Sequence, residues 1–361
     1  MDALTSTPKS LSTRPMWERR MNVTIKDVAR LADVSVATVS RVLNASAPVR
    51  EVTRARVLKV ARDLRFTPNG AARTLSSRHA RALGVILPDL YGEFFSELLR
   101  GIDLEAQRTG HSLLVSSSHH DAHGVSVAVR SMRGRVDGLL VMAPELSPAA
   151  LATAIPDGMP VVILNALPTP GASAAVMVDN MAGTRAVVHY LAKLGHCEVA
   201  FICGPRSNAD AAARLRGYRT AMRSAGLTVR PEFVLAGDFT EDSGWRAARE
   251  LMGRKGKRPT ALFAANDAMA VGALLALHES NVDVPGEISV VGFDDIPIAR
   301  YVTPALTTVH VAIDVLGGRA AALLFRALAD PAGGVGTHKE VVPAELIVRH
   351  SCGPPPSTKT R

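Results

Sequence analysis

With 361 residues, 47% of them hydrophobic, the chain is too long for one ordinary domain and apolar enough to bury more than one core. No run of about eighteen apolar residues occurs, so we expect no membrane span, and residues 1–21 lack the apolar stretch of a secretory signal. Cys197, Cys203 and Cys352 lack the paired spacing of metal ligands, and we interpret them as reduced thiols of a cytoplasmic protein.

The net charge of +9 is concentrated near one end of the chain. Residues 22–81 contain 12 Lys and Arg against 4 Asp and Glu, whereas residues 82–361 contain 26 against 27. A small basic module joined to a nearly neutral body indicates a polyanionic partner. We expect residues 1–21, which precede this module, to form a disordered leader.

Two short helices separated by about one turn are the first predicted elements. Thr24 precedes an apolar run and Asp27 follows it by three positions, as at a helix N-terminus. Asp33 stands at the turn between the two helices. The turn can still form there, because aspartate tolerates the left-handed region better than most residues. Ser35 is placed to cap the second helix. The buried stripe of the first helix consists of Ile25, Val28, Ala29 and Ala32.

The second predicted helix has an apolar face and a face of small residues. Val39, Val42 and Leu43 point inward, and the opposite face carries Val36, Ala37, Ser40 and Arg41. Small side chains let a helix approach base edges in the major groove, arginine binds guanine O6 and N7, and serine can bond a phosphate. A third helix over residues 52–64 closes the core with Val57, Val60, Ala61 and Leu64.

After Pro68, Asn69 can cap a further helix over about residues 70–76. A helix this short, with a glycine at its start, is unstable alone and needs a partner. Its outward face carries Ala72, Arg73 and Leu75. An exposed leucine there can enter a base step as an apolar wedge and open the minor groove. The alternative is a plain linker with an incidental leucine.

The stretches TIKDVARLADVSVATVSRVLN and LRFTPNGAARTLSS resemble, without gaps, the headpiece and hinge helix of the LacI/GalR family of bacterial transcription regulators. The resemblance implies that Val36 and Ala37 read half-site bases with Arg41 beside them, and that Leu75 is the hinge wedge. The residues implied at the DNA are Thr24, Ser35, Val36, Ala37, Thr38, Ser40, Arg41, Asn44, Asn69, Ala72, Arg73 and Leu75. Two positions depart from the family pattern: Asp33 replaces the usual turn glycine, and Arg50 replaces a common capping serine, which weakens the cap and adds attraction for phosphate.

Beyond residue 81 the chain alternates short aliphatic runs with amphipathic helices. This alternation is typical of parallel sheets with helices on both faces, and about 270 residues exceed one such core, so we expect two α/β lobes. The predicted helices include residues 95–108, 181–194, 214–225 and 268–280. The predicted strands are ALGVILP, HSLLVSSS, VDGLLVMA, PVVILNA, AAVMVDN, EVAFICG, EFVLAGDF, TALFAAND, ISVVGFDD and LTTVHV.

Polar residues collect at the ends of these strands, where open parallel sheets bind ligands. Carboxylates, amides and an arginine can bond vicinal hydroxyls, and aromatic rings can cover the apolar face of a sugar, so a polyol or sugar fits. Asn266, Asp267 and Asp294 are each equally consistent with a plain cap. The polar residues are Asn165, Arg214, Asn266, Asp267, Asp294 and Asp295, and the aromatic ones are Phe94, Phe95 and Phe239.

The body also resembles the periplasmic-binding-protein-like core of the same family, in RVDGLLVM, LRGYRTAM, GDFTEDSGWRA, ANDAMAVGALLAL and ISVVGFDDIPIARYVTPALTTVH. The implied fold is an all-α helix-turn-helix headpiece plus an α/β core of two doubly wound parallel-sheet lobes. Asn208 stands where purine-responsive members carry arginine, and Ala166 where several carry tryptophan; the pattern is most similar to members that sense ribose or related sugars. The positions that match effector-binding residues are Phe94, Phe95, Asn165, Asn208, Arg214, Phe239, Asn266 and Asp294.

These patterns predict the following boundaries. A helix-turn-helix domain covers residues 22–67, a hinge 68–80, an effector-binding and dimerisation core 81–350, and a disordered tail 351–361. Within the core, the N-lobe takes residues 81–178 and 311–333, and the C-lobe takes 179–308 and 337–350. The tail has no leucine heptad, so we expect a dimer without a C-terminal coiled coil.

The predicted function is a cytoplasmic repressor of carbohydrate uptake or catabolism genes. A homodimer binds a pseudo-palindromic DNA operator, and a small sugar-like effector changes the affinity through the hinge. The alternatives are a regulator that responds to a nucleoside or another metabolite and, more remotely, a sugar-binding transport protein.

We expect neither an enzyme nor a cofactor or metal site. No GxGxxG after the first strand, GxxxxGK[ST] or GxSxG motif is found. Asp294 and Asp295 are neighbours on a strand and should point to opposite faces, which argues against a catalytic pair. His119, His120, Asp121 and His123 are more typical of a polar loop than of a metal site.

Overall fold

The computed structural model describes residues 23–44, 47–66, 79–156, 158–167, 169–330 and 338–356. The chain divides into two units, Met1–Arg78 and His79–Arg361. The predicted leader, the predicted DNA contacts Asn69, Ala72, Arg73 and Leu75, most of the hinge and residues 357–361 lie outside the described residues, as does the side chain of Asn44.

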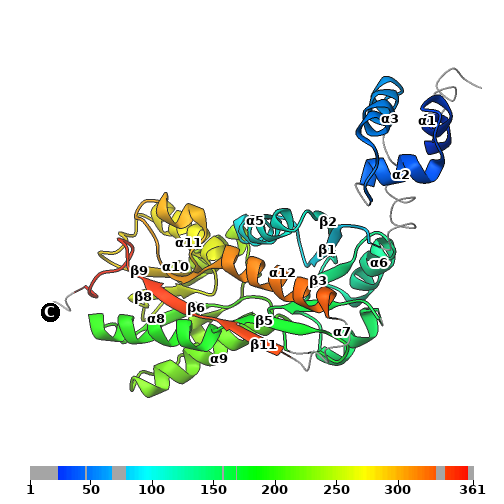
Figure 1. Cartoon of the computed structure of the whole chain (residues 1–361). Helices are drawn as coiled ribbons and strands as arrows, with labels where there is room; N and C mark the ends of the chain where they lie inside the picture. The colour runs from blue at the N-terminus through cyan, green and yellow to red at the C-terminus, as the bar shows by residue number, and fades with distance from the viewer. Residues whose placement is uncertain are drawn as a thin grey trace, which may run out of the picture. The chain divides into compact units, whose positions relative to one another are not determined.

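The first unit contains three described helices, α1 (Ile25–Leu31), α2 (Val36–Asn44) and α3 (Glu51–Asp63), which are drawn in blue in Figure 1. Their apolar stripes meet in one small core, whose fully buried residues are Val28, Ala32, Val39 and Val57. The predicted three-helix core is therefore present, although Val60 and Leu64 are only partly buried.

The ends of these helices follow the predicted chemistry. The Asp27 carboxylate accepts hydrogen bonds from the Thr24 backbone N–H at 3.0 Å and from its hydroxyl at 2.7 Å. The Thr38 N–H donates to Ser35 Oγ at 3.2 Å, which caps α2. Asp33 has φ of 49°, the left-handed conformation expected at the turn. Arg50 makes no side-chain cap for α3, as expected from the missing serine.

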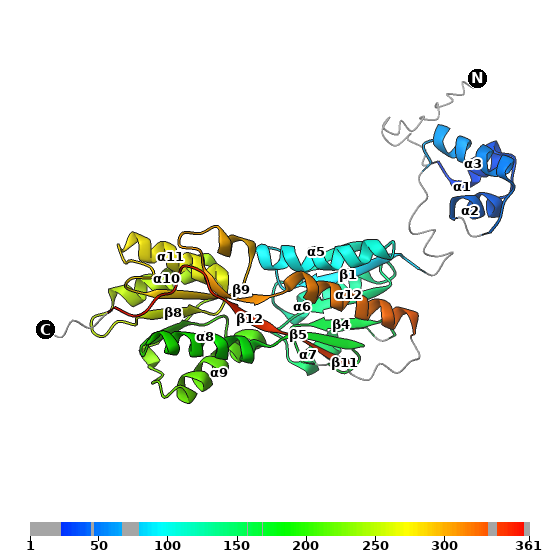
Figure 2. The ribbon, with the colours of Figure 1, turned by 60° about the vertical axis from the view of Figure 1, so that its left-hand side comes forward.

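The second unit consists of two α/β lobes, which lie side by side in Figure 2. The first lobe has a parallel sheet in the order β11-β5-β4-β3-β1-β2. Its strands are β1 (Ala82–Leu87), β2 (Ser112–Ser117), β3 (Gly138–Met142), β4 (Val161–Leu164), β5 (Ala174–Val178) and β11 (His338–Val342). Its helices are α5 (Glu93–Arg108), α6 (Ala122–Met132), α7 (Pro148–Ala154) and α12 (Ile313–Ala329).

The second lobe repeats this plan in the order β12-β10-β9-β8-β6-β7, with only β12 antiparallel to its neighbour. Its strands are β6 (Val199–Ile202), β7 (Val234–Leu235), β8 (Ala261–Ala264), β9 (Ser289–Asp294), β10 (Thr307–Val311) and β12 (Ala344–Ile347). Its helices are α8 (Asn180–Leu194), α9 (Ala209–Ser224), α10 (Glu241–Gly253), α11 (Asp267–Glu279) and the 3-10 turns η1 (Pro231–Phe233) and η2 (Pro297–Arg300).

Buried central strands hold each lobe together. Every residue of β3, β4, β6, β8 and β9 is buried, as expected for parallel sheets covered on both faces. Each of the ten predicted strand runs contains a strand, although EFVLAGDF forms only the two-residue β7. Helix α9 begins at Ala209, five residues before its predicted start.

Three chain crossings join the lobes, and the last was predicted in the wrong place. They lie between β5 and α8, between β10 and α12, and between β11 and β12. Residues 338–342 were assigned to the C-lobe, but as β11 they pair with β5 of the first lobe. The sequence HKEVV does not predict this strand, because an exposed edge strand needs no continuous apolar run.

The predicted disordered tail is wrong for its first residues. Ser351 is fully buried, donates its hydroxyl hydrogen to the Val290 carbonyl at 2.6 Å and accepts the Thr307 N–H at 2.8 Å. His196 Nε2 lies 2.9 Å from the Gly353 carbonyl. The start of the tail is therefore fastened to β9 and β10 of the second lobe.

Other features of the described residues bear on the function classes. No described helix is long and apolar enough to cross a membrane. All three cysteines are free. In the loop after β2, Asp121 caps α6 by accepting the Gly124 N–H at 2.6 Å, and no metal-binding group of three or more His, Cys, Asp or Glu is found among the described residues.

Candidate functional site

The outer face of α2 is the candidate DNA-reading surface. Val36 is 40% exposed, Ala37 and Arg41 are also exposed, while Val39 and Val42 on the opposite face are buried. Thr38 and Ser40 are half-buried, and the Thr38 hydroxyl lies 2.9 Å from Ser35 Oγ. The fold thus presents one arginine among small side chains, which is the arrangement that base-edge contacts require.

Helix α3 adds positive charge to the same unit. Its cationic side chains are exposed, and those within the helix are Arg54, Arg56, Lys59 and Arg62. Such side chains attract phosphates without regard to base sequence.

A cavity of about 710 Å³ lies between the two lobes of the second unit. The strand ends of both sheets meet there, as expected for ligand sites of open parallel sheets. Two of the polar residues predicted at the strand ends, Asp267 and Asp295, do not line it. The eight positions that the family resemblance matched to effector-binding residues all do: Phe94, Phe95, Asn165, Asn208, Arg214, Phe239, Asn266 and Asp294.

Arg214 on α9 is the centre of the polar wall. The side chain is buried and held by three groups: Nε donates to Asn180 Oδ1 at 2.8 Å, Nη1 to the Ala265 carbonyl at 2.6 Å, and Nη2 pairs with Asp294 Oδ1 at 3.0 Å. Its guanidinium carbon lies 3.7 Å from the centre of the Phe293 ring. These contacts fix the guanidinium in a single position.

Asp294 is presented to the cavity by an unusual backbone. Its φ is 113°, a region that L residues rarely adopt, and the residue is 5% exposed. Burial raises the pKa of Asp294 to about 6, although the charge of Arg214 opposes the rise. The carboxylate can therefore accept hydrogen bonds from hydroxyl groups at neutral pH.

Aromatic side chains form the apolar part of the wall. Phe94 and Phe95 meet edge to face with ring centres 5.5 Å apart at the start of α5. Phe239 has φ of 72°, and its ring covers Gly204, where a Cβ would come within 2.4 Å of the ring. Only glycine at position 204 leaves room for this ring.

Asn266 and Asn208 each serve as helix caps and cavity residues. Asn266 accepts the Met269 N–H at 3.0 Å and donates to the Phe239 carbonyl at 2.9 Å. Asn208 accepts the Asp210 N–H and donates Nδ2 to Glu145 of the other lobe at 3.2 Å. Both asparagines therefore cap a helix and also line the cavity.

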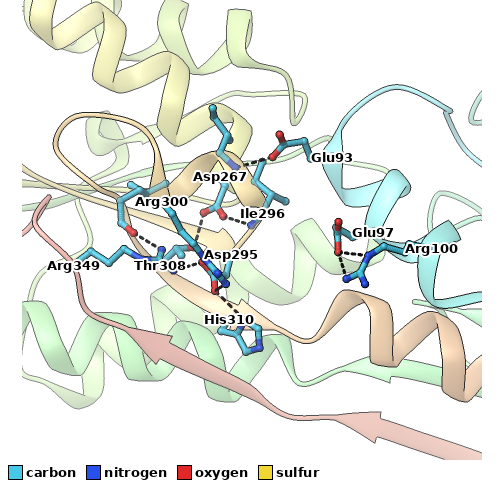
Figure 3. Close-up of polar contacts among 12 residues, drawn as sticks. Glu93, Glu97, Arg100, Asp267, Asp295, Ile296, Arg300, Thr308, His310 and Arg349 are labelled. Atoms are coloured by element: carbon cyan, nitrogen blue, oxygen red, sulfur yellow. Dashed lines mark hydrogen bonds and ion pairs between the residues drawn. The ribbon is translucent and has the colours of Figure 1, made fainter. Parts of the chain in front are cut away.

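The structure adds residues that the sequence did not assign to the effector site, among them one histidine of the loop after β2. Glu145, Asp210 and His120 line the cavity, and the His120 ring lies 3.2 Å from Glu145 Oε1. Glu93 accepts the Ile298 N–H at 2.8 Å and so joins the lobes on another side (Figure 3). Glu145 stands three residues after the end of the buried strand β3, which was an available signal. The partners of Glu93 and Asp210 were not visible in the sequence.

Asp295 does not line the cavity, so it and Asp294 point to different sides, as predicted; the reason differs, because Asp295 lies just beyond β9 and has φ of 57°. Its carboxylate contacts Arg349 at 2.5 Å, His310 at 3.0 Å and Arg300 at 3.6 Å (Figure 3). Asp267 does not line the cavity either. It is buried in the second lobe, where it accepts the Ile296 N–H at 2.9 Å and the Thr308 hydroxyl at 2.5 Å. Burial and the neighbouring charge of Asp294 raise the pKa of Asp267 well above its ordinary value. Both residues brace the loop after β9.

Comparisons with known proteins agree with this geometry. Residues 24–69 match the family of bacterial regulatory proteins of the lacI family, and residues 188–352 match the periplasmic binding protein-like domain. The ribose operon repressor of Escherichia coli (strain K12) is 36% identical over 310 residues, which cover 85% of this chain and 94% of that protein. The chain belongs to the LacI family.

Further regulators and solved structures are also similar to this LacI-family protein. The HTH-type transcriptional regulator GalR of Escherichia coli (strain K12) is 36% identical over 308 residues, covering 85% of this chain and 89% of GalR. The lac repressor dimer bound to operator and the anti-inducer ONPF has a TM-score of 0.81 at 30% identity, covering 91% of this chain and 98% of that one. The CelR–cellobiose complex has a TM-score of 0.68 at 29% identity, covering 91% and 99%.

The comparisons confirm the family resemblance and the fold. This LacI-family protein is a DNA-binding transcriptional regulator with a helix-turn-helix domain and a two-lobed periplasmic-binding-like core. The named relatives are regulators of transcription rather than enzymes.

Proposed function

We propose that this protein represses genes of carbohydrate uptake or catabolism, and that a small sugar bound between its lobes changes its affinity for an operator. The observation that carries the proposal is the cavity itself, which brings the eight predicted effector residues together. Aromatic rings and hydrogen-bonding side chains share its wall, as sugar recognition requires, and its volume suits a small ligand.

The DNA-binding part of the proposal rests on α2. Val36 and Ala37 contact bases in the major groove, Arg41 binds guanine, and Thr38 and Ser40 lie near phosphates. The other headpiece residues proposed at the DNA are Thr24, Ser35 and Asn44. Two headpieces of a homodimer read the two halves of a pseudo-palindromic operator. In the proposed hinge, Asn69 caps the helix, Leu75 enters a base step as a wedge, and Ala72 and Arg73 lie in the minor groove.

Coupling between the two sites follows from the construction of the cavity. Three chain crossings join the lobes, and the cavity draws side chains from both. A ligand that bonds to both lobes favours one of their relative positions. Because the hinge leads directly into β1 of the first lobe, that change can alter the pairing of two hinge helices in a dimer.

A nucleoside effector is the second candidate. The HTH-type transcriptional repressor PurR of Proteus mirabilis (strain HI4320) is 36% identical over 308 residues. Phe239 and the Phe94–Phe95 pair could hold a base as well as a sugar ring. Asn208 stands where purine-responsive members of the family carry arginine, which argues against this candidate.

Selection of duplexes from a random pool by the purified chain tests the proposal. The selected duplex is then titrated, by fluorescence anisotropy at fixed salt, with neutral pentoses, hexoses and nucleosides. We expect a preferred sequence and one sugar that changes the dissociation constant by about tenfold or more. Absence of any preferred duplex contradicts the proposal, and a response to nucleosides alone replaces it with the second candidate.

A further inference from the structure

One end of the cavity contains buried hydrogen-bonding groups with no protein partner. We call Glu145, Asn165 and Asp210 the acidic cluster; all three line the cavity. Asn165 is 1% exposed and lies close to Asp210, yet neither atom of its amide has a partner that meets hydrogen-bond geometry. Oε2 of Glu145 is buried and unpartnered as well. Buried polar groups are rarely left unpaired, so these atoms are placed to bind a ligand.

Carboxyl groups outnumber basic groups in the wall of the cavity as a whole. Among the residues that the structure describes, seven carboxyl side chains, one guanidinium and the imidazole of His120 line it. The guanidinium is that of Arg214, and each of its three nitrogen atoms already has a partner. An anionic ligand would therefore meet several carboxylates without an uncommitted arginine to neutralise it.

Asp210 shows how unfavourable further negative charge would be. Burial raises its pKa, and Arg214 and Asn180 offset only part of this effect. Asn180 Nδ2 donates to Asp210 Oδ1 at 2.7 Å, so the protein already stabilises this carboxylate with the donors that it has. A phosphate or carboxylate group close by would add like-charge repulsion in a water-poor site.

The acidic cluster also spans the two lobes. Glu145 and Asn165 follow strands of the first lobe, whereas Asp210 lies in the first turn of α9 in the second. Asn208 Nδ2 joins α9 to Glu145 at 3.2 Å, and the Ala209 N–H donates to the Pro144 carbonyl at 2.9 Å. A hydroxyl group bound between Glu145 and Asp210 would therefore contact both lobes at once.

We infer that the effector is an uncharged polyol whose hydroxyl groups donate to the acidic cluster, and that phosphorylated and carboxylated sugars are excluded. Hydroxyls satisfy the unpaired Glu145 oxygen, and they can both donate to and accept from the Asn165 amide. This inference rests on the proposed function, because it takes the cavity as the effector site. It specifies the charge of the ligand and the residues that select it.

The test uses calorimetric titration of the purified full-length chain with matched ligands. Each neutral sugar is paired with its anionic derivative: D-ribose with D-ribose 5-phosphate, D-glucose with D-glucose 6-phosphate and with D-glucuronate, and D-galactose with D-galacturonate. We expect at least one neutral sugar to bind, at least about tenfold more tightly than its anionic partner. Tighter binding of an anionic member, or no binding of any neutral sugar, overturns the inference.

Two nearly isosteric variants assign the selectivity to the cluster. Glu145→Gln and Asp210→Asn keep the shape of the side chains and remove their charge. Each variant should raise the dissociation constant of the neutral sugar by about tenfold. Each should also reduce the ratio of the two dissociation constants, that of the anionic partner over that of the neutral sugar. Glu232→Gln, which changes an exposed carboxylate outside the cavity, should leave the affinity for the neutral sugar and the selectivity against its anionic partner unchanged. Unaltered selectivity in both cluster variants, with folding confirmed by an unchanged circular dichroism spectrum, contradicts the assignment.

Operator binding without any ligand separates this inference from the proposed function. A chain that binds a selected duplex but responds to a sugar phosphate overturns the inference and leaves the repressor function standing. A chain that binds neutral sugars selectively but no duplex supports the inference and overturns the repressor function.

Discussion

Arg214 and Asp294 form a buried ion pair of 3.0 Å in the wall of the interlobe cavity, and both residues belong to the second lobe. The pair is braced from behind, since Asn180 and the Ala265 carbonyl hold the guanidinium. It therefore provides a fixed polar surface to which a ligand can bind while the first lobe moves.

Removing Asp294 should separate effector response from DNA binding. Asp294→Ala leaves Arg214 as a buried cation without its carboxylate and should cost about 3 kcal/mol of stability. The effector response should be lost, whereas operator affinity, measured by anisotropy with the folded variant, should remain. An unchanged response to the sugar would show that the pair does not bind the effector.

Effector affinity should depend on pH through the same residue. The pKa of Asp294 is raised by burial to about 6, so the carboxylate loses its charge as the pH falls below that value and becomes a poorer acceptor. Titrations at pH 5.5 and 7.5 should show weaker binding at the lower pH. Arg214, Asp210 and Asp267 also act on this group, so Asp294→Asn is the control, and its affinity should vary less between the two conditions.

Stability should follow the opposite trend over part of the acidic range. The pKa of Asp294 is near the ordinary aspartate value of 3.8 in the unfolded chain, and burial raises it to about 6 in the fold. Because the fold favours the protonated carboxyl, its contribution to the free energy of unfolding falls as the pH rises from about 4 to 6 and is constant above. Urea unfolding of the wild type and Asp294→Asn across this window isolates the contribution; a difference between them that does not vary with pH argues against it.

Exchanging side chains on the outer face of α2 should change which operator is preferred. Val36 and Ala37 are exposed and near the start of the helix, where base contacts are made. Replacing either should redirect a duplex selection, and Arg41→Ala should lose about 1–3 kcal/mol of discrimination at one guanine. Arg62→Gln on α3 should instead weaken all duplexes alike; identical selected sequences from wild type and Val36 variants would refute the reading role.

The hinge wedge makes a different prediction. Leu75→Ala should weaken binding to the selected operator more than binding to unrelated DNA, because the proposed wedge would enter a base step only in the specific complex. Anisotropy titrations with both duplexes give the ratio of affinities. Equal losses on the two duplexes would leave Leu75 without a role in the minor groove.

The segment after β12 should contribute to stability. Ser351→Ala leaves the Thr307 N–H without its partner in a buried place and should cost about 1–3 kcal/mol, seen as a lower melting temperature. Removal of residues 357–361 serves as the comparison, and we expect a smaller effect. A stable Ser351→Ala variant would mean that the buried serine is dispensable.

Much of this site was predictable because local chemistry marks it. In the first unit, Thr24, Asp33 and Ser35 are residue types typical of helix ends and turns. In the cavity, Asn165 and Asn266 come where aliphatic strands end. Arg214 and Phe239 were named from their places near strand ends as well as from the family resemblance, whereas Asn208 came from the resemblance alone.

The residues that the sequence missed are defined by distant contacts. Asp210 reads as an ordinary first-turn acid of α9, and only the fold brings it to a cavity shared with Glu145. Ser351 stands in a polar, proline-rich stretch, and its burial depends on Val290, 61 positions away. Local composition carries no record of such pairings.

The most direct test measures operator affinity of the wild type and of Arg214→Ala, each with and without a saturating neutral sugar. We predict that both proteins bind the selected duplex, that the sugar changes the wild-type dissociation constant by about tenfold or more, and that the variant does not respond to the sugar. An equal response from both proteins, or a wild-type protein that binds no duplex at low ionic strength, would contradict this prediction.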